Sequence, residues 1–308
     1  MRILVYGAGV LGSYLAHTLI GVPDNEVTVL ARGKRAEELK KDGIMIRHYF
    51  QRRDTQNPVK VITELAAEDY YDLMFVVMQY GQFDAVLPIL AANVSENIVL
   101  SGNNVKAPAM EEYLVKNSPR PKKVAFGFQT GAGMRTESGK VVAIHGRGNA
   151  MFGELRAENQ VFPLIQQAFG KKKVSQQNQI DEWLKAHLAY ITPMNGVHYL
   201  YDGDLKKLVK AEQGVKEMGT ATQEAFAVLS DLGYQIVPRA QAKLVESTRL
   251  NYLFNQVYHR LPLNRFVKGS PNETAALFQS FRDLKKQSSR QTPTWDKIEA
   301  DFFQKYQR

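Results

Sequence analysis

The first half of the chain alternates short apolar runs with segments of helical periodicity. Residues 11–20, 36–42, 83–92 and 110–116 have a helical pattern. Strand patterns occupy residues 3–6, 27–30, 59–63, 73–78, 98–100, 124–130 and 141–145. The run 73–78 has no polar residue, which is typical of a strand buried on both faces of a parallel sheet. Strands that alternate with helices predict a doubly wound parallel sheet of the Rossmann type.

The second half has a different texture. From about residue 180 onward the strand-like runs nearly vanish, and apolar residues recur three and four apart in 180–200, 205–232, 241–257 and 275–288. A polar stretch, 171–178, separates the half with strand patterns from the half with helical patterns. A chain of 308 residues is also long for a single hydrophobic core. We therefore predict an α/β fold with a Rossmann domain over residues 1–175. An all-helical substrate and dimerisation domain is predicted over residues 176–308.

Composition narrows the classes of partner. The net charge of +9 is spread among acidic residues and comes with no nucleic-acid motif, so we expect small anionic ligands and no nucleic acid. Residues 3–23 carry no charge but contain four glycines, and no membrane span is expected. The absence of cysteine excludes disulfides and favours a reducing cytoplasm, and the scattered histidines suggest no metal site.

A glycine-rich loop follows the first strand. Residues 3–13 fit the pattern strand–GxGxxG–helix. Gly7 would make the tight turn, Gly9 would let a pyrophosphate approach the backbone, and Gly12 would let helix and strand pack closely. The free N–H groups of the helix N-terminus would face the phosphates. The predicted cofactor-binding residues of this loop are Gly7, Ala8, Gly9, Val10, Leu11 and Gly12.

The end of the second strand favours NADP(H) over NAD(H). NAD-binding proteins place a carboxylate there for the ribose hydroxyls. Here Arg32 takes that place, with Lys34 and Arg35 close behind. A guanidinium would attract a 2′-phosphate and can bind it through two N–H groups.

On these motifs the chain resembles the ketopantoate reductase (2-dehydropantoate 2-reductase) family, which joins a Rossmann domain to a helical domain and reduces a 2-keto acid with NADPH. The family's Lys-x-x-Gln element corresponds to residues 79–82, where Gln82 matches and Gln79 replaces the lysine. Asn103 matches the asparagine of the family's Asn-Gly turn, and Asn104 replaces the glycine. The resemblance implies that Gln79, Gln82 and Asn103 line the cofactor site.

The resemblance also implies a general acid. The family's Trp-x-Lys motif is matched by Trp183 and Lys185, and the lysine would lie early in the first helix of the second domain. The family's asparagines four and eight residues further on are replaced by Ala189 and Pro193. Its Ser…Asp…Thr-Glu element, whose carboxylate binds the substrate's hydroxyl, has only a loose counterpart in residues 246–249.

These features predict NADPH-dependent reduction of a small 2-keto acid, ketopantoate to pantoate or a close relative, as in pantothenate biosynthesis. Lys185 would give the proton, and Asn103 would place the nicotinamide or the substrate carbonyl. Two alternatives stay open. One is a non-catalytic NADP(H)-binding sensor or partner-binding protein, and the other is a related reductase with a different substrate. A homodimer through the helical domain is also left open.

Overall fold

The chain divides into two units. The computed structural model describes residues 1–129, 131–144, 150–261 and 270–306. The first unit comprises Met1–Gly102 and Lys106–Ile180, and the second comprises Asn103–Val105 and Asp181–Arg308. The boundary expected from the sequence, after residue 175, falls within strand β12 (Val174–Gln176).

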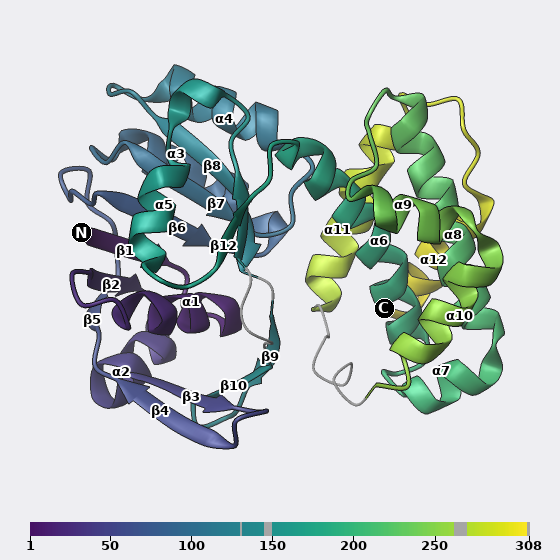
Figure 1. The fold of residues 1–308 in the computed structure, drawn as a ribbon, viewed down its shortest axis with the longest axis horizontal. Coiled ribbons are helices and arrows are strands. Elements are labelled where there is room, and N and C mark those ends of the chain that lie inside the picture. The colour runs from purple at the N-terminus through teal and green to yellow at the C-terminus, as the bar shows by residue number, and fades with distance from the viewer. Residues whose placement is uncertain (130, 145–149, 262–269, 307–308) are drawn as a thin grey trace. The chain divides into compact units, whose positions relative to one another are not determined.

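A mostly parallel sheet forms the centre of the first unit (Figure 1). In the described part of the chain its strand order is β12-β11-β8-β7-β6-β1-β2-β5. The strands from β8 to β5 pair in parallel, and β11 pairs antiparallel with β8. Besides β12, the strands are β1 (Arg2–Tyr6), β2 (Glu26–Leu30), β5 (Lys60–Ile62), β6 (Leu73–Val77), β7 (Asn97–Ser101), β8 (Lys123–Gln129) and β11 (Ala150–Gly153).

The strand order reverses beside β1. The chain runs from β1 to β2 and β5 on one side and from β6 to β7 and β8 on the other. In an open α/β sheet the carboxyl ends of the two strands at such a reversal border the ligand crevice. The register places Tyr6 opposite Val76, so β1 and β6 end at the same level.

Helices complete the doubly wound arrangement and confirm the predicted fold class. Helices α1, α2 and α5 share one core cluster with the sheet, and α3 packs against α4 (Figure 1). The rings of Phe75, Phe152 and Phe169 meet in that cluster with centroids 5.8–6.2 Å apart. The helices are α1 (Val10–Ile20), α2 (Gly33–Asp42), α3 (Phe83–Ala92), α4 (Ala107–Asn117) and α5 (Phe162–Phe169).

A second sheet was not predicted. Its order is β4-β3-β10-β9, with β3 (Ile44–His48), β4 (Arg53–Asn57), β9 (Ala132–Arg135) and β10 (Val141–Ile144). Strand β10 was expected to follow the strands of the main sheet, but it pairs with β3 and β9 instead. Residue 145, the end of that predicted strand, lies outside the described residues. The second sheet packs on α1, because Val141 and Ala143 belong to the same core cluster as that helix.

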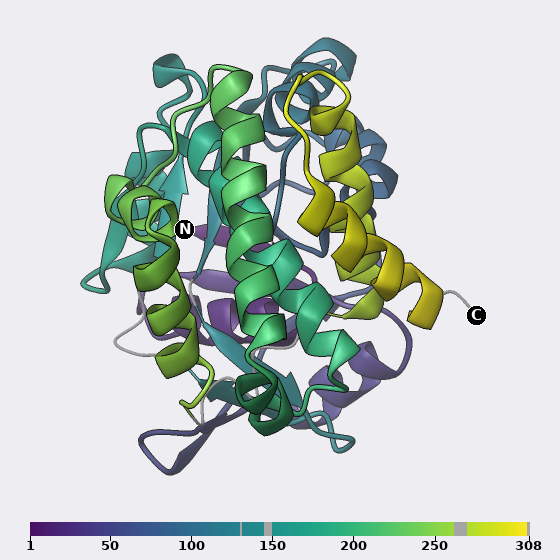
Figure 2. The same cartoon turned by 90° about the vertical axis from the view of Figure 1, so that its right-hand side faces the viewer.

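Helices make up the second unit, as expected (Figure 2). They are α6 (Ile180–Leu200), α7 (Leu205–Ala211), α8 (Gln213–Asp231), α9 (Arg239–Glu246), α10 (Thr248–Tyr258), α11 (Pro271–Lys285) and α12 (Pro293–Tyr306). Helix α12 packs on α8 and α11, and the indole of Trp295 lies 4.4 Å from the ring of Phe281. No helix in the described ranges is long and apolar enough to cross a membrane.

Three details of the helical unit differ from the sequence expectation. The predicted helix 205–232 is two helices, because the chain bends at Glu212, where φ is 48°. The predicted helix 241–257 is also two, and the hydroxyl of Ser247 caps the second by accepting from the N–H of Leu250. Helix α12 was not predicted.

Candidate active site

The glycine loop lies where the strand order reverses, between the ends of β1 and β6. Gly7 has φ 119°, and a Cβ added there would lie 2.2 Å from the carbonyl oxygen of Val77. A Cβ added at Gly12 would lie 1.9 Å from the carbonyl oxygen of Gly7. Real Cβ atoms do not approach oxygen so closely, so the two backbones can meet here only through glycine.

Gly9 is glycine for a different reason. A Cβ added there would meet no described atom within 4 Å, so the space above it is open. Gly9 is also the N-cap of α1, and no side chain of the described residues caps that helix. The first N–H groups of α1 therefore remain available for an anion beside an uncrowded backbone. Ala8, Val10 and Leu11 complete this loop, which fits the pyrophosphate of a dinucleotide.

One of the two arginines after β2 is exposed and the other is half-buried. Arg32 is exposed, donates to the hydroxyl of Tyr6 at 2.8 Å and lies with Cζ 5.9 Å from the Tyr6 ring centroid. Arg35 is only 10% exposed. Its guanidinium donates to the Ala8 carbonyl at 3.1 Å and the Ser13 hydroxyl at 2.9 Å. Arg32 is therefore free to meet a ligand, whereas Arg35 supports the glycine loop.

Gln79 and Gln82 follow β6, the strand whose end meets Gly7. Both side chains are exposed, and the backbone N–H of Gln79 donates to the side-chain oxygen of Gln82 at 3.2 Å. Gln79 is the N-cap of a short 3-10 turn, Tyr80–Gln82, and Gln82 is its last residue. The fold thus brings the carboxyl ends of β1 and β6 together, and the side-chain amides of Gln79 and Gln82 follow the end of β6.

Asn103 follows β7 and belongs to the second unit. Its side-chain amide donates to a carboxylate oxygen of Glu273, near the start of α11, at 2.8 Å. Burial raises the pKa of Glu273, and the hydrogen bond from Asn103 partly opposes that effect. The structure therefore joins a predicted site residue to a carboxylate that the sequence analysis missed.

A local signal could have drawn attention to Glu273. The residues Ser270-Pro271-Asn272-Glu273 have the spacing of a helix-capping box, and the Ser270 hydroxyl accepts from the Glu273 N–H at 3.0 Å. In a capping box the glutamate would bind back to the cap, but this carboxylate binds Asn103. Residues 246–249, the loose counterpart considered from sequence, form the junction between α9 and α10 instead.

Lys185 is buried on α6 as one partner of an ion pair. Its side chain is 2% exposed, and Nζ contacts a carboxylate oxygen of Asp181, one helical turn earlier. The same nitrogen lies 4.6 Å from the ring centroid of Tyr234. A buried ammonium needs such partners, because removing a charge from water is costly unless it is paired. Trp183 lies on the same helix and stacks on His187, with ring centroids 5.3 Å apart.

The helix positions that carry asparagine in the family hold no amide here. Ala189 is fully buried, and Pro193 lies inside α6. Asn195 lies further along the helix and is also buried. Lys185 therefore has a carboxylate and an aromatic ring as neighbours, and the two helix positions at which the family has asparagine carry no amide.

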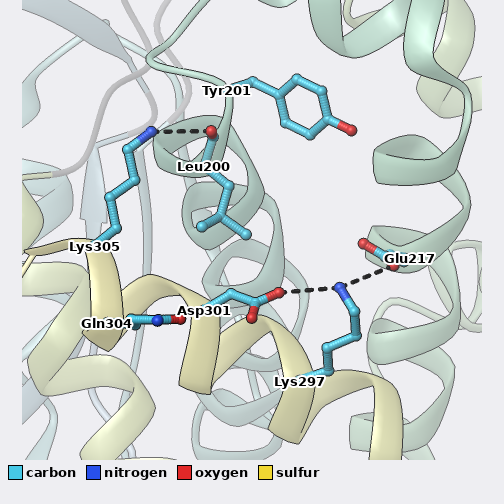
Figure 3. A pocket seen from close by; sticks show the side chains of 7 residues that line it. All are labelled: Leu200, Tyr201, Glu217, Lys297, Asp301, Gln304 and Lys305. Atoms are coloured by element: carbon cyan, nitrogen blue, oxygen red, sulfur yellow. Dashed lines mark hydrogen bonds and ion pairs between the residues drawn. The ribbon is translucent and has the colours of Figure 1, made fainter.

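One pocket in the second unit is not proposed as the catalytic centre (Figure 3). It measures about 500 Å³, and its charged side chains are held in ion pairs, with Lys305 paired to Asp202 outside the lining. Lys297 contacts Glu217 at 3.2 Å and Asp301 at 3.0 Å, and Lys305 donates to the Leu200 carbonyl at 3.0 Å.

Residues 1–129, 131–144, 150–261 and 270–306 contain no group of three or more histidine or acidic side chains placed to hold a metal.

Comparison with known proteins identifies the class of this chain. Residues 3–157 match the model of the family described as ketopantoate reductase PanE/ApbA. This match covers half of the chain, and with the Rossmann sheet and glycine loop it defines an oxidoreductase acting on C=O and CH–OH groups. The chain belongs to the ketopantoate reductase PanE/ApbA family. No curated protein sequence matches it.

Solved structures share the whole fold. D-mandelate dehydrogenase with NADH and anilino(oxo)acetate is 15% identical, with a TM-score of 0.79 over 99% of this chain and 97% of that one. A PanE/ApbA family ketopantoate reductase from Ralstonia eutropha JMP134 is 17% identical, with a TM-score of 0.76 over 98% and 97%. A dimeric ketopantoate reductase from Staphylococcus aureus is 13% identical, with a TM-score of 0.72 over 100% and 99%. At these identities the likeness shows the fold alone.

The two glycine environments predict opposite effects of an added methyl group. Gly12→Ala should lower the melting temperature and weaken cofactor binding, because its Cβ would collide with the Gly7 carbonyl. Gly9→Ala should leave the melting temperature unchanged and weaken only the binding of the nicotinamide dinucleotide, because its Cβ occupies only the open space. Thermal unfolding and nucleotide titration of both variants measure the two effects. Equal melting temperatures for both variants would contradict the packing argument.

His187 predicts a pH-dependent loss of stability. Burial lowers the pKa of His187 to about 4, whereas a histidine in the unfolded chain titrates near 6.5. Between these values the unfolded state binds more protons, so the free energy of unfolding should fall as the pH drops, by roughly 3 kcal/mol at most. Urea unfolding from pH 7 to pH 4 should show this slope in the wild type and a weaker slope in His187→Phe. Parallel curves would be evidence against the assignment.

Proposed function

We propose that this protein is an NADPH-dependent reductase of a small anionic 2-keto acid, 2-dehydropantoate or a close relative. The observation that carries the proposal is the uncapped, open N-terminus of α1 at Gly9, in a chain whose residues 3–157 match the family model. Gly7, Gly9, Gly12, Arg32, Gln79 and Gln82 hold the cofactor in this proposal. A cysteine-free chain agrees with action in the cytoplasm, where a pantothenate pathway would use it.

The preference for NADP(H) rests on Arg32. It is exposed, Tyr6 supports it, and the residue before it, Ala31, is not a carboxylate that would repel a phosphate. A guanidinium in this place favours a 2′-phosphate. The structure of D-mandelate dehydrogenase contains NADH, so in this proposal the side chain after β2 decides between the two cofactors.

Lys185 supplies the proton in the proposed reaction. The bound cofactor supplies a hydride to the carbonyl carbon. The Lys185 ammonium stabilises the developing alkoxide and protonates it, and the Asp181 carboxylate balances the ammonium charge. Tyr234 covers the same ammonium and limits the access of water to it.

Asn103 and Glu273 would orient the substrate. Their hydrogen bond fixes the Asn103 amide, so the amide oxygen and the second carboxylate oxygen can each meet a substrate group. Glu273 would take the role of the family's hydroxyl-binding carboxylate. Because burial raises its pKa, it repels an anionic substrate less than an ordinary glutamate would.

A homodimer through the helical unit is part of the proposal. Exposed apolar side chains at Leu250, Leu253, Phe254 and Val257 share one face of α10, since they lie three and four residues apart. The relative from Staphylococcus aureus is dimeric. An exposed apolar face of this kind often marks a protein interface.

Replacement of Lys185 tests the catalytic assignment. Lys185→Met should lower turnover of a 2-keto acid by about 10²–10⁴-fold and leave NADPH binding unchanged, because it removes only the acid. Lys216→Met is a matched control. Like Lys185, Lys216 pairs with a carboxylate one turn earlier, that of Glu212, and lies 5.7 Å from the centroid of an aromatic ring, that of Tyr252, but it is 57% exposed.

The readout is NADPH oxidation across a panel of 2-keto acids at saturating cofactor. Retained turnover in Lys185→Met would remove the lysine from the mechanism. If the wild type binds NADPH tightly but reduces no member of the panel, the alternative of a non-catalytic NADP(H)-binding sensor is favoured.

Arg32 tests the cofactor preference. Arg32→Ala should raise the Kd for NADPH by about tenfold or more and change the Kd for NADH little, because the lost contact is a charge-assisted hydrogen bond to the 2′-phosphate. Tyr6→Phe, which removes only the hydroxyl that positions Arg32, should have a smaller effect in the same direction. Fluorescence titration with both nucleotides measures the ratio. An equal loss for both would contradict the 2′-phosphate assignment.

A further inference from the structure

Strand β9 of the second sheet lies against the start of α1. A Cβ added at Gly133 would lie 2.9 Å from the side chain of Val10 and 2.4 Å from the Val142 carbonyl oxygen. Val10 is the first residue of α1 and a member of the glycine loop. Glycine at position 133 thus allows β9 to pass in direct contact with the loop that would hold the pyrophosphate.

Arg135 projects from the same face of β9 as Gly133. Side chains two residues apart in a strand share a face, and directly paired residues on neighbouring strands do too. Gly133 pairs with Ala143 and Arg135 pairs with Val141, and both partners are buried in the core cluster that includes α1. Arg135 therefore lies on the α1 side of the sheet, although its own side chain is exposed at the edge strand.

Arg35 ties the turn beyond β9 to the glycine loop. Its guanidinium donates to the Gly139 carbonyl at 2.8 Å and also to the Ala8 carbonyl at 3.1 Å. The two contacts fix the end of the second sheet beside the loop. Arg135 pairs with Val141, two residues after Gly139, so Arg35 and Arg135 both lie at this end of the second sheet, and burial together with the nearby positive charge of Arg135 lowers the pKa of Arg35.

The local charges are unbalanced. Glu38 pairs with Arg35 at 3.0 Å, whereas Arg135 makes no ion pair within residues 1–129, 131–144, 150–261 and 270–306. An exposed arginine at the same end of the sheet as another arginine, two residues from the glycine that contacts the positive end of α1, favours an anion at this place. The dinucleotide carries two kinds of anionic group, the pyrophosphate and the 2′-phosphate.

We propose that Arg135, on the edge strand of the second sheet, binds a phosphate group of the dinucleotide held by the glycine loop. This inference rests on the proposed function for the presence of the cofactor and adds a binding residue from outside the main sheet. The second sheet then has a role in cofactor binding, because it carries a positive charge to the N-terminus of α1.

The test uses the full chain and three variants. Arg135→Gln removes the charge, and Arg135→Lys keeps it. Arg53→Gln is the matched control, because Arg53 is an exposed arginine on β4, the opposite edge strand of the same sheet. The Kd values for NADPH and NADH are measured by nucleotide fluorescence, and melting temperatures confirm that each variant is folded.

Arg135→Gln should raise the Kd for NADPH by about tenfold or more, as expected when one charge-assisted hydrogen bond is lost. Arg135→Lys should recover part of the loss, and Arg53→Gln should bind like the wild type. An effect on NADPH alone assigns Arg135 to the 2′-phosphate, and an equal effect on NADH assigns it to the pyrophosphate. If Arg135→Gln binds both nucleotides like Arg53→Gln, the inference is overturned while the proposed function stands. A wild type that binds neither nucleotide overturns both.

Discussion

The close approach of three backbone segments at Gly7, Gly12 and Val77 is the constraint on which the rest of the first unit depends. Two strands end and one helix begins within van der Waals reach of one another, and a single methyl group at either glycine would separate them. Because the backbones are so close, the N-terminus of α1 is held at the level where the strands end. This packing positions the free N–H groups of α1, the exposed Arg32 and the two glutamines after β6.

In the second unit the corresponding constraint is electrostatic. Burial of the Lys185 ammonium is tolerated because Asp181 and Tyr234 surround it, and burial of Glu273 is tolerated because Asn103 donates to it. Both arrangements hold ionisable groups in poorly solvated surroundings. There a small change in contacts produces a large change in the free energy of the charged form of the group. Such sites are common where proteins move protons.

The sequence predicted six of the eight strands described in the main sheet, because each of the six has a short strand-like run; β11 was not predicted, and β12 lies in the polar stretch 171–178 that was taken as the boundary. Residues 73–78 are wholly apolar, and the glycine spacing at 7, 9 and 12 is rare outside dinucleotide loops. The second sheet escaped notice because β4 consists of Arg53–Asn57, a strand without a single apolar residue. Its position is decided by pairing with β3, which is a tertiary contact and leaves no periodicity to find.

The candidate site could be predicted only where its residues are close in sequence. Lys185 was found through the neighbouring Trp183, since a lysine by itself is most often exposed. Glu273 was missed because its meaning comes from a hydrogen bond to a residue 170 positions earlier. The residue before it is Asn272, whereas the family's Ser…Asp…Thr-Glu element has threonine before the glutamate. Long-range pairing of this kind cannot be derived from local spacing.

The assignment of Asn103–Val105 to the helical unit has a consequence for dissecting the molecule. The chain passes from the first unit to the second and back before it finally leaves at residue 180, so the first unit is discontinuous in sequence. A fragment that ends at residue 180 would keep Asn103–Val105 but lose the rest of their unit, and two of these residues, Asn104 and Val105, are buried in the intact protein. An isolated Rossmann half would need a redesigned turn between β7 and α4, and recombination with a relative would have to exchange this tripeptide together with the helices.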